Sequence, residues 1–269
     1  MTRDLRDSFY TSMTRVIIAG PRGRMGSQIT ALATADPEIQ IIGVLDSMPE
    51  VSSSSSVPVV KSLAELKGDS LQGAVLIDFT TPEATLVHAA ECAAAGVAMV
   101  VGTTGFEGEQ RAHLEKVSSQ IPLLIAANTS LGVTVLLDVV KRLSAVLPDY
   151  DIEIVESHHN RKKDSPSGTA LAFAEAAAAG RKVQLADVRI DGRTGLLGER
   201  PKGEIAIHSV RAGDIAGEHT IYFAGPGERV EVVHRASSRQ TFAAGALTAA
   251  KFLAKSKPGL YRMSDVLGI

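Results

Sequence analysis

The sequence predicts an α/β fold with a doubly wound parallel sheet, followed by a second α+β domain with a mixed or antiparallel sheet. Strand-like and helix-like segments alternate from Arg15 to about Ala127, an order typical of parallel strands joined by right-handed helical crossovers. The strands in this half are nearly all apolar, as expected when helices cover both faces of a sheet. After Asn128 the pattern changes, and from Asp187 onward strands are joined by glycine-rich turns. This change indicates a second architecture.

Each element of the first half has a local signal. The expected strands are aliphatic or β-branched runs: RVIIAG (15–20), IQIIGVLD (39–46), GAVLIDF (73–79), VAMVVGTTG (97–105) and PLLIAAN (122–128). The expected helices carry apolar residues at helical spacing: MGSQITALATAD (25–36), SLAELKG (62–68), PEATLVHAAECAAAG (82–96) and EGEQRAHLEKVSS (107–119). Pro82 suits a helix start and Gly96 a helix end. The serine-rich segment 51–58 predicts a surface loop with no function implied.

The second half begins with a long amphipathic helix at 131–147, a strand at 151–157 and a helix that ends near Ala179. The later strands are VRI (188–190), GEIAIHSVR (203–211), EHTIYFA (218–224) and ERVEVVHRA (228–236), and the last helix is TFAAGALTAAKFLA (241–254). We therefore expect two domains of different architecture.

Composition narrows the class of protein. The chain has 269 residues, 45% hydrophobic and 22% charged, as in ordinary globular proteins with a buried core. The net charge of −2 argues against a nucleic-acid partner, and no apolar run approaches the ~20 residues that span a bilayer. The first twelve residues lack the apolar core of a signal peptide and predict a short extension. The only cysteine, Cys92, is expected to be a buried apolar residue, and the expected location is the cytoplasm.

A strand, three glycines and a helix follow one another in RVIIAGPRGRMGSQI. Gly20, Gly23 and Gly26 lie at the strand-to-helix turn, where glycine lets backbone amides approach a pyrophosphate. The spacing departs from the usual G-x-G-x-x-G. However, Asp46 ends the next strand, 20 residues after Gly26, where an acid can accept hydrogen bonds from an adenosine ribose. The order favours a Rossmann-like dinucleotide site over a glycine-rich turn with a chance aspartate.

Two further strand ends point to the same edge of the sheet. They are Gly102-Thr103-Thr104 and Ala126-Ala127-Asn128. Ligands of open α/β sheets bind beyond the carboxyl ends of the strands, so both segments are candidates to contact the nicotinamide. Taken singly, each is equally typical of an ordinary turn.

The segment ESHHNRKKDSPSGTA (156–170) is unusually rich in titratable groups. His158 and His159 should face opposite sides while the strand lasts, so we expect different roles for them. For either one alone, a hydrogen-bonded structural histidine is an equally good interpretation. A metal site is not expected, because the cysteine is distant and the neighbouring lysines and arginine repel cations.

The helix that follows this segment begins at Ser167-Gly168-Thr169, and amides at a helix start suit a carboxylate. Lys162 and Lys163 add positive charge nearby. A solvated basic loop would explain the lysines but not the helix start and the imidazoles beside them. Together these features predict a site for a small dianion that receives a proton.

Motifs across the chain resemble one family. They are GPRGRMG, DFTTPE, VVGTTGF, ANTSLGV, ESHHNRKKDSPSGTA, HSVRAGDIAGEHT, ERVEVVHRASSRQTFAAGAL and KPGLYRMSDVLGI. By these motifs the sequence resembles the 4-hydroxy-tetrahydrodipicolinate reductase (dihydrodipicolinate reductase) family. The resemblance covers almost the whole chain from Arg15 onward. The resemblance implies reduction of 4-hydroxy-tetrahydrodipicolinate by NADH or NADPH, with loss of water, in the diaminopimelate route to lysine.

The resemblance also implies roles for individual residues. His158 would be the acid and Lys162 the second proton-transfer group. The implied substrate contacts are His159, Lys162, Ser167, Gly168 and Thr169. The implied cofactor contacts are Gly20, Pro21, Arg22, Gly23, Arg24, Met25, Asp46, Gly102, Thr103, Thr104, Ala126, Ala127, Asn128 and Thr129, with no metal.

Domain limits and assembly are likewise implied by the family. Residues 1–129 and 240–269 would bind the dinucleotide, and residues 130–239 would bind the small dicarboxylate substrate and form a homotetramer through their sheet. The chain departs from the family pattern at Thr129, where many members carry an aromatic residue, and at Asn160 and Lys163. Two alternatives stay open: a redox sensor, for which no spare segment supplies a reader module, and a different amino-acid dehydrogenase.

The sequence also bears on the choice of cofactor. Asp46 is followed by Ser47, at a place where NADPH users commonly carry an arginine, and this favours NADH. Arg22 and Arg24 in the glycine turn could still reach a 2′-phosphate.

Overall fold

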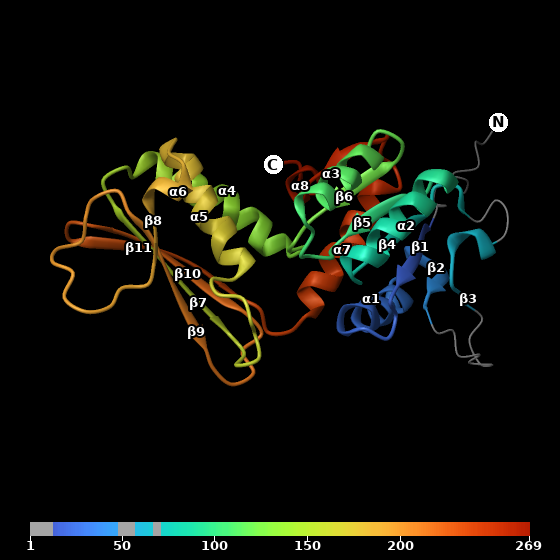
Figure 1. Cartoon of the computed structure of the whole chain (residues 1–269), viewed down its shortest axis with the longest axis horizontal. Helices are drawn as coiled ribbons and strands as arrows, with labels where there is room; N and C mark the ends of the chain where they lie inside the picture. Colours follow the sequence, from blue (N-terminus) through green and yellow to red (C-terminus); the bar gives the residue numbers. More distant parts are fainter. Residues whose placement is uncertain (1–12, 48–56, 67–70) are drawn as a thin grey trace, which may run out of the picture. The chain divides into compact units, whose positions relative to one another are not determined.

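The computed structural model describes residues 13–47, 57–66 and 71–269. The chain forms two compact units (Figure 1): unit 1 comprises Met1–Thr129 and Phe242–Val266, and unit 2 comprises Ser130–Thr241 and Leu267–Ile269. The expected extension at 1–12, most of the serine-rich loop and the end of the helix expected at 62–68 lie outside the described residues. In the described part of the chain no helix has the length and apolar character needed to cross a membrane.

Unit 1 is built on a parallel sheet. Among the described residues it has seven strands in the order β12-β6-β5-β4-β1-β2-β3, and each neighbouring pair is parallel. The strands are β1 (Thr14–Ala19), β2 (Ile39–Leu45), β3 (Val59–Val60), β4 (Val75–Asp78), β5 (Ala98–Val101), β6 (Pro122–Ile125) and β12 (Gly259–Tyr261). From β1 the chain runs outward to β2 and β3 on one side and then crosses back to β4 on the other side of β1, so the strand order reverses between β1 and β4. Such a switch point is where ligands of these sheets bind.

Helices complete unit 1. They are α1 (Arg24–Ala35), the 3₁₀ turn η1 (Leu63–Glu65), α2 (Pro82–Ala95), α3 (Gly108–Val117), α7 (Gln240–Leu253) and α8 (Met263–Leu267). Every residue of β4 and β5 is buried, as the apolar strand pattern predicts for a sheet covered on both faces. The predicted doubly wound parallel sheet is confirmed. The strands β3 and β12 were not expected, because they are two and three residues long.

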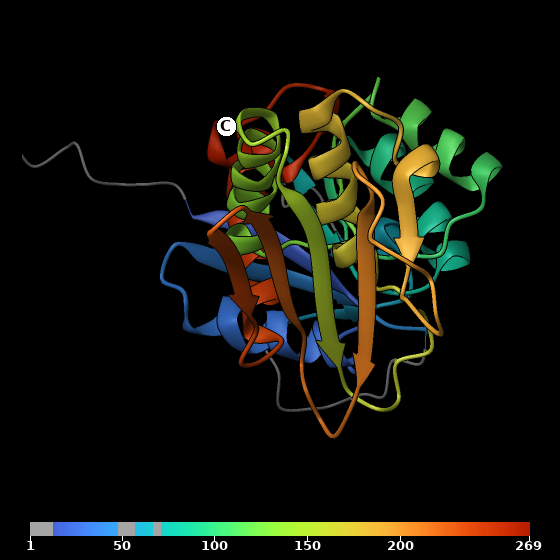
Figure 2. The ribbon, with the colours of Figure 1, turned by 90° about the vertical axis from the view of Figure 1, so that its left-hand side faces the viewer.

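Unit 2 contains a mixed sheet, which Figure 2 shows strand by strand, in the order β11-β10-β7-β9-β8. The strands are β7 (Asp151–His158), β8 (Arg189–Asp191), β9 (Ile205–Arg211), β10 (Glu218–Gly225) and β11 (Glu228–Arg235), and the helices are α4 (Leu131–Val146), α5 (Gly168–Arg181) and α6 (Leu185–Val188). β7, β9 and β8 run parallel, whereas β10 is antiparallel to both β7 and β11. The predicted second α+β domain with a mixed sheet is confirmed.

The two faces of the unit 2 sheet differ. Along β7, buried and half-buried residues alternate, and the buried ones, Ile152 and Ile154, pack in one cluster with Phe173 of α5. Glu156 and His158 share this buried face, whereas Glu153 and Val155 lie on the other face, which we call the open face.

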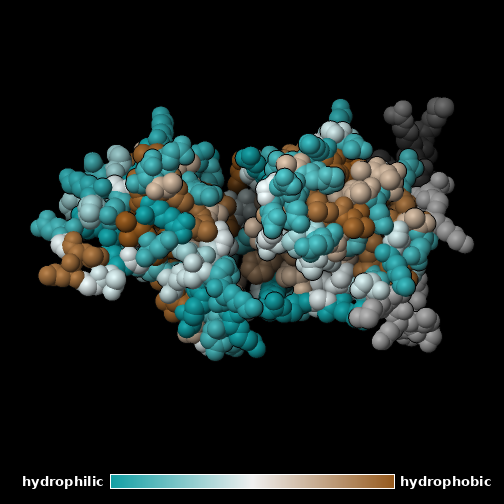
Figure 3. Space-filling view, viewed as in Figure 1, coloured by the Kyte–Doolittle hydropathy of each residue, from teal (hydrophilic) through white to brown (hydrophobic). Residues whose placement is uncertain are grey.

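The side of the molecule drawn in Figure 3 is largely hydrophilic, with apolar patches between the polar groups.

Candidate active site

The turn between β1 and α1 requires glycine at two positions. Gly20 has a φ of +66°, which side chains rarely adopt, and a Cβ on Gly26 would lie 2.1 Å from the Gly20 carbonyl oxygen. Gly23 caps α1 without a side-chain hydrogen bond, so backbone alone forms the start of this helix. Such a turn fits a pyrophosphate, because amides can approach it closely and the helix dipole favours negative charge. The predicted residues Pro21, Arg22, Arg24 and Met25 lie in or directly after the same turn.

The predicted ribose acid has a partner within unit 1. Asp46 directly follows β2, and its carboxylate accepts a hydrogen bond from the Arg22 guanidinium. The Arg22 side chain is 53% exposed and that of Asp46 only 10%. The structure thus brings the glycine turn and the acid together through the contact of Arg22 with Asp46.

Other strand ends join the same edge. The Gly102 amide donates to the Asp78 carbonyl at 2.8 Å, and the Ala126 amide donates to the Val101 carbonyl at 2.9 Å. A Cβ on Gly20 would lie 3.0 Å from Cγ2 of Thr80, and one on Gly102 would overlap the Phe79 ring. The structure therefore assembles the glycine turn and the segments 102–104 and 126–128 at the carboxyl edge of one sheet.

Thr129 has a different environment. Its side chain is 1% exposed, and its hydroxyl donates to the Phe242 carbonyl oxygen at 2.6 Å. This hydroxyl therefore ties the end of the β6 connection to α7 inside unit 1.

A buried carboxylate that the sequence reasoning did not single out lies at the same edge. Asp78, at the end of β4, is 0% exposed and accepts hydrogen bonds from the Thr80 amide and hydroxyl, the Thr103 hydroxyl and the His88 ring. Thr85 of α2 donates to Thr103 at 2.9 Å. The carboxylate thus joins β4, β5 and α2 next to the glycine turn.

In unit 2 a second buried carboxylate organises the predicted proton donor. His158, the last residue of β7, has its Nδ1 2.5 Å from Oε2 of Glu156. Arg211 of β9 donates to both carboxylate oxygens of Glu156, and the Ser167 amide donates to Oε1 at 3.1 Å. Burial raises the pKa of Glu156, but the hydrogen bonds from His158 and Arg211 outweigh it and hold that pKa well below its usual range. Glu156 is therefore an ionised carboxylate inside the unit.

A third histidine packs against this cluster. His219 of β10 is 3% exposed, and its ring lies edge-to-face with His158, with 5.3 Å between ring centroids. Its Nε2 is 3.2 Å from the Ser167 hydroxyl. Burial, assisted by the nearby charge of His158, lowers the pKa of His219 to about 3, so His219 is neutral at neutral pH.

The loop after β7 carries the remaining predicted residues. Lys162 forms an ion pair with Asp164, with 2.9 Å between Nζ and Oδ2. His159 lies just beyond the strand, and partial burial together with the charges of Arg239 and Arg161 lowers its pKa. Its Nδ1 is buried without a hydrogen-bond partner among the described residues.

The helix start expected to bind a carboxylate is also present. Ser167 caps α5, because its hydroxyl accepts from the Ala170 amide, and α5 begins at Gly168 followed by Thr169. A Cβ on Gly168 would meet nothing within 4 Å, so open space adjoins this first turn. The structure brings His158 and Ser167 together through Glu156. Among the described residues no cluster of His, Cys, Asp and Glu could hold a metal ion.

Four functional candidates were missed by the sequence reasoning: Glu156, Arg211, His219 and Asp78. A signal for Glu156 was present, because it lies two residues before His158 in a strand and so shares its face. Arg211 and His219 lie in the motif HSVRAGDIAGEHT, but their contacts with residues 52 and 55 positions away depend on strand pairing that no local pattern reveals.

Comparison with known proteins identifies relatives over both units. The family model described as dihydrodipicolinate reductase, N-terminus, matches residues 14–129, and the C-terminus model matches residues 132–267. Proteins named 4-hydroxy-tetrahydrodipicolinate reductase from Desulfovibrio desulfuricans and Rubrobacter xylanophilus are 49% and 48% identical. These alignments cover 94% and 95% of this chain, and 99% and 98% of the relatives.

Solved structures agree with these relatives. A dipicolinate-bound dihydrodipicolinate reductase from Paenisporosarcina sp. TG-14 superposes with a TM-score of 0.74 at 28% identity, over 93% of this chain and 97% of that one. A DAP dehydrogenase from C. glutamicum gives a TM-score of 0.55 at 14% identity, over 93% and 92% of the two chains, and shares the fold alone. With both halves matched and relatives nearly 50% identical, the chain belongs to the dihydrodipicolinate reductase family.

Proposed function

We propose that this chain reduces 4-hydroxy-tetrahydrodipicolinate to tetrahydrodipicolinate, with loss of water, using NADH or NADPH. This is a reductive step of the diaminopimelate route to lysine. The observation that carries the proposal is the pairing of His158 with the buried carboxylate of Glu156, which also holds the Ser167 amide at the start of α5. An imidazole beside a helix start suits a dicarboxylate that accepts a proton. The Paenisporosarcina relative is described as binding dipicolinate, a planar dicarboxylate.

The carboxyl edge of the unit 1 sheet is assigned to the cofactor. The turn Gly20–Met25 offers backbone amides to the pyrophosphate, and Asp46 offers a carboxylate to the adenosine ribose. The segments Gly102–Thr104 and Ala126–Thr129 are assigned to the nicotinamide half. When bound, the cofactor supplies the hydride.

The loop and helix start of unit 2 are assigned to the substrate. Gly168 and Thr169 lie in the first turn of α5, where a carboxylate is favoured by the helix dipole. Lys162 supplies positive charge, and the Nδ1 of His159, which has no partner among the described residues, supplies a further polar contact. Ser167 completes this set of five residues.

His158 is assigned as the acid and Lys162 as the second proton-transfer group. Hydride addition to a conjugated imine develops negative charge in the ring, which a nearby cation stabilises and an acid quenches. Since Glu156 accepts from Nδ1 of His158, Nε2 is the nitrogen left to release a proton. The ion pair with Asp164 holds the Lys162 ammonium group within the same loop.

Domain roles, assembly and location complete the proposal. Residues 1–129 and 240–269 are assigned to dinucleotide binding, and residues 130–239 to substrate binding and to oligomerisation in a homotetramer. The division of the chain after Thr129 and before Phe242 supports the first two limits to within two residues, whereas Leu267–Ile269 group with unit 2. The cytoplasm is the proposed location, and it suits a chain whose single cysteine, Cys92, is free and buried.

A coupled assay tests the function. The synthase that joins pyruvate and aspartate semialdehyde supplies the substrate, and loss of reduced-cofactor absorbance reports turnover. His158→Gln and Lys162→Ala should each lower kcat by about 100-fold or more with NADH affinity unchanged. The exposed residues His113 and Lys116 of α3 provide matched controls as His113→Gln and Lys116→Ala. A wild-type chain without turnover would refute the function, and near-normal turnover in both loop variants would refute the assignment of the acids.

A further inference from the structure

Glu156 is 0% exposed and accepts four hydrogen bonds from His158, Arg211 and Ser167, besides a contact with the side chain of Ser209. Oε2 accepts from His158 Nδ1 at 2.5 Å and from Arg211 Nη1 at 2.8 Å. Oε1 accepts from the Ser167 amide at 3.1 Å and from Arg211 Nη2 at 2.7 Å. Each oxygen therefore accepts two hydrogen bonds, and the carboxylate has no capacity left for a substrate. Any effect of Glu156 on the reaction must therefore pass through the groups that it holds in place, His158, Arg211 and the Ser167 amide.

Those groups belong to the two halves of the proposed substrate site. An ionised carboxylate can only accept, so it requires the proton on Nδ1 of His158 and leaves Nε2 as the exchanging nitrogen. A Cβ on Gly217 would lie 3.1 Å from that Nε2, so the glycine leaves room beside it. The same carboxylate fixes the amide of Ser167, the residue that caps α5.

The charges around His158 come from several elements. Glu156 lies on its own strand, Arg211 comes from β9, and His219 comes from β10. His159 and Lys162 follow in the loop, where Lys162 is paired with Asp164. His219 is neutral at neutral pH because burial lowers its pKa to about 3. Within the cluster, Glu156 therefore carries a full negative charge and Arg211 a full positive charge.

We propose, building on the function proposed above, that Glu156 is a positioning residue that fixes the tautomer of His158 and the start of α5 together, and that Arg211 offsets its charge so that His158 can release its proton. A buried carboxylate without that arginine would hold the proton on the imidazole more tightly, because charges interact strongly in a site of low dielectric. The bidentate arginine cancels most of this attraction while leaving the hydrogen bond in place.

The test compares two substitutions with opposite electrostatic effects. Glu156→Gln should lower kcat by about 100-fold and move the alkaline limb of the kcat–pH profile to lower pH, because the proton on the acid loses its anionic partner. Arg211→Met should move the same limb to higher pH, because the carboxylate is no longer offset. Glu156→Gln should also weaken binding of pyridine-2,6-dicarboxylate about 10-fold, measured by calorimetry, with NADH affinity unchanged.

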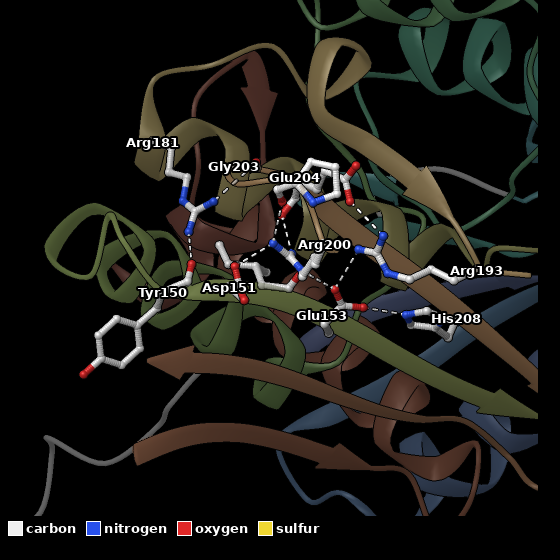
Figure 4. A network of polar contacts seen from close by, with 11 residues as sticks. Tyr150, Asp151, Glu153, Arg181, Arg193, Arg200, Gly203, Glu204 and His208 are labelled. Carbon is white, nitrogen blue, oxygen red and sulfur yellow. Dashed lines mark hydrogen bonds and ion pairs between the residues drawn. The ribbon is translucent and has the colours of Figure 1, made fainter. Parts of the chain in front are cut away.

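Glu153 provides the matched control. Figure 4 shows that it too receives hydrogen bonds from arginines and a histidine, namely Arg193, Arg200 and His208, but it lies on the open face of β7. Glu153→Gln removes a similar network from the same strand without touching His158. It should leave the pH profile and the dicarboxylate affinity unchanged.

Nitrogen NMR of the imidazoles separates this inference from the function itself. In the wild-type chain at alkaline pH the His158 ring should carry its proton on Nδ1, and Glu156→Gln should lose that preference, whether or not the chain turns substrate over. If Glu156→Gln does not fold, Glu156→Asp keeps the charge and should lower kcat without moving the limb toward lower pH. The proposal would be overturned if the alkaline limb of the kcat–pH profile stayed in place in both Glu156→Gln and Arg211→Met, or if it shifted in the same direction in both.

Discussion

At the scale of single residues, the contact between Arg22 and Asp46 bears on cofactor choice. Asp46 is largely buried and accepts from a guanidinium that is half exposed. A 2′-phosphate brings roughly two negative charges close to that carboxylate, so NADPH requires a cation that is not already used. Ser47, the next residue, supplies none. Of the two arginines in the glycine turn, Arg22 is already paired with the acid.

We therefore expect NADH to be used at least as well as NADPH. Ser47→Arg should raise the ratio of kcat/KM for NADPH over NADH by about 10-fold, the effect of roughly 1.4 kcal/mol. Measuring both cofactors at one ionic strength gives this ratio. Arg111→Ala, which removes an arginine from α3 of unit 1, is the control for Arg22→Ala. A strong wild-type preference for NADPH that Arg22→Ala abolishes would contradict the expectation and show that the arginine outweighs Asp46.

The residues that could be predicted from sequence are those with a local signal. The glycines of the first turn, the histidine pair and the SGT helix start each depend on neighbours within a few positions, and the structure has the turn and the helix where they were expected. The burial of Thr129 and the hydrogen bond of its hydroxyl could not be predicted, because the partner is Phe242, 113 positions away. Asp78 was missed for the same reason, since burial of a carboxylate depends on partners brought in by the fold. Glu156 did have a local signal, its place two residues before His158, but its partner Arg211 is 55 positions away.

At the scale of elements, Asp78 joins β4, β5 and α2 at the carboxyl edge of the unit 1 sheet. An amide in its place would turn a donor toward His88 or toward the threonines. Asp78→Asn should therefore weaken NADH binding about 10-fold and cost about 1–3 kcal/mol in unfolding free energy. Calorimetry with NADH and denaturant unfolding measure the two effects.

Binding of pyridine-2,6-dicarboxylate shows whether Asp78→Asn affects only the cofactor edge of unit 1 or the whole fold. Its binding residues are assigned to unit 2, so Asp78→Asn should leave its affinity within about twofold, as should the control Asp138→Asn on the surface of α4. An equal loss of both affinities would mean that Asp78 supports the whole fold rather than the cofactor edge.

Some helices and strands could be predicted from the sequence and others could not. Strands of four or more apolar residues and helices with capping signals were found, because each carries its own periodicity. β3 and β12 were not, since two- and three-residue strands form only because β2 and β6 offer them an edge. Within the described part of the helix expected at 62–68, the structure has a single 3₁₀ turn at Leu63–Glu65, with Ser62 as its N-cap and Leu66 as its C-cap.

At the scale of the whole molecule, the open face of the unit 2 sheet bears on assembly. One row across this face contains Val155, Thr220 and Val233, which are paired between neighbouring strands. Val233 is 39% exposed and Val210 on β9 is 43% exposed. Apolar side chains gathered on one sheet face are typical of a surface that another chain covers. This arrangement supports the proposed homotetramer.

Val233→Lys should therefore convert the tetramer into smaller species, because burying four ammonium groups in an interface that a valine side chain now fills is unfavourable. Light scattering with size-exclusion chromatography measures the mass of the particle at several concentrations. Val87→Lys on α2 of unit 1, where the valine is 59% exposed, adds the same charge at a comparable exposure and should leave the mass unchanged. Surface substitutions of this kind alter folding by only about 0.5 kcal/mol, so a change in mass reports assembly. A tetramer that survives Val233→Lys, or a wild-type chain that is monomeric throughout, would contradict assembly through this face.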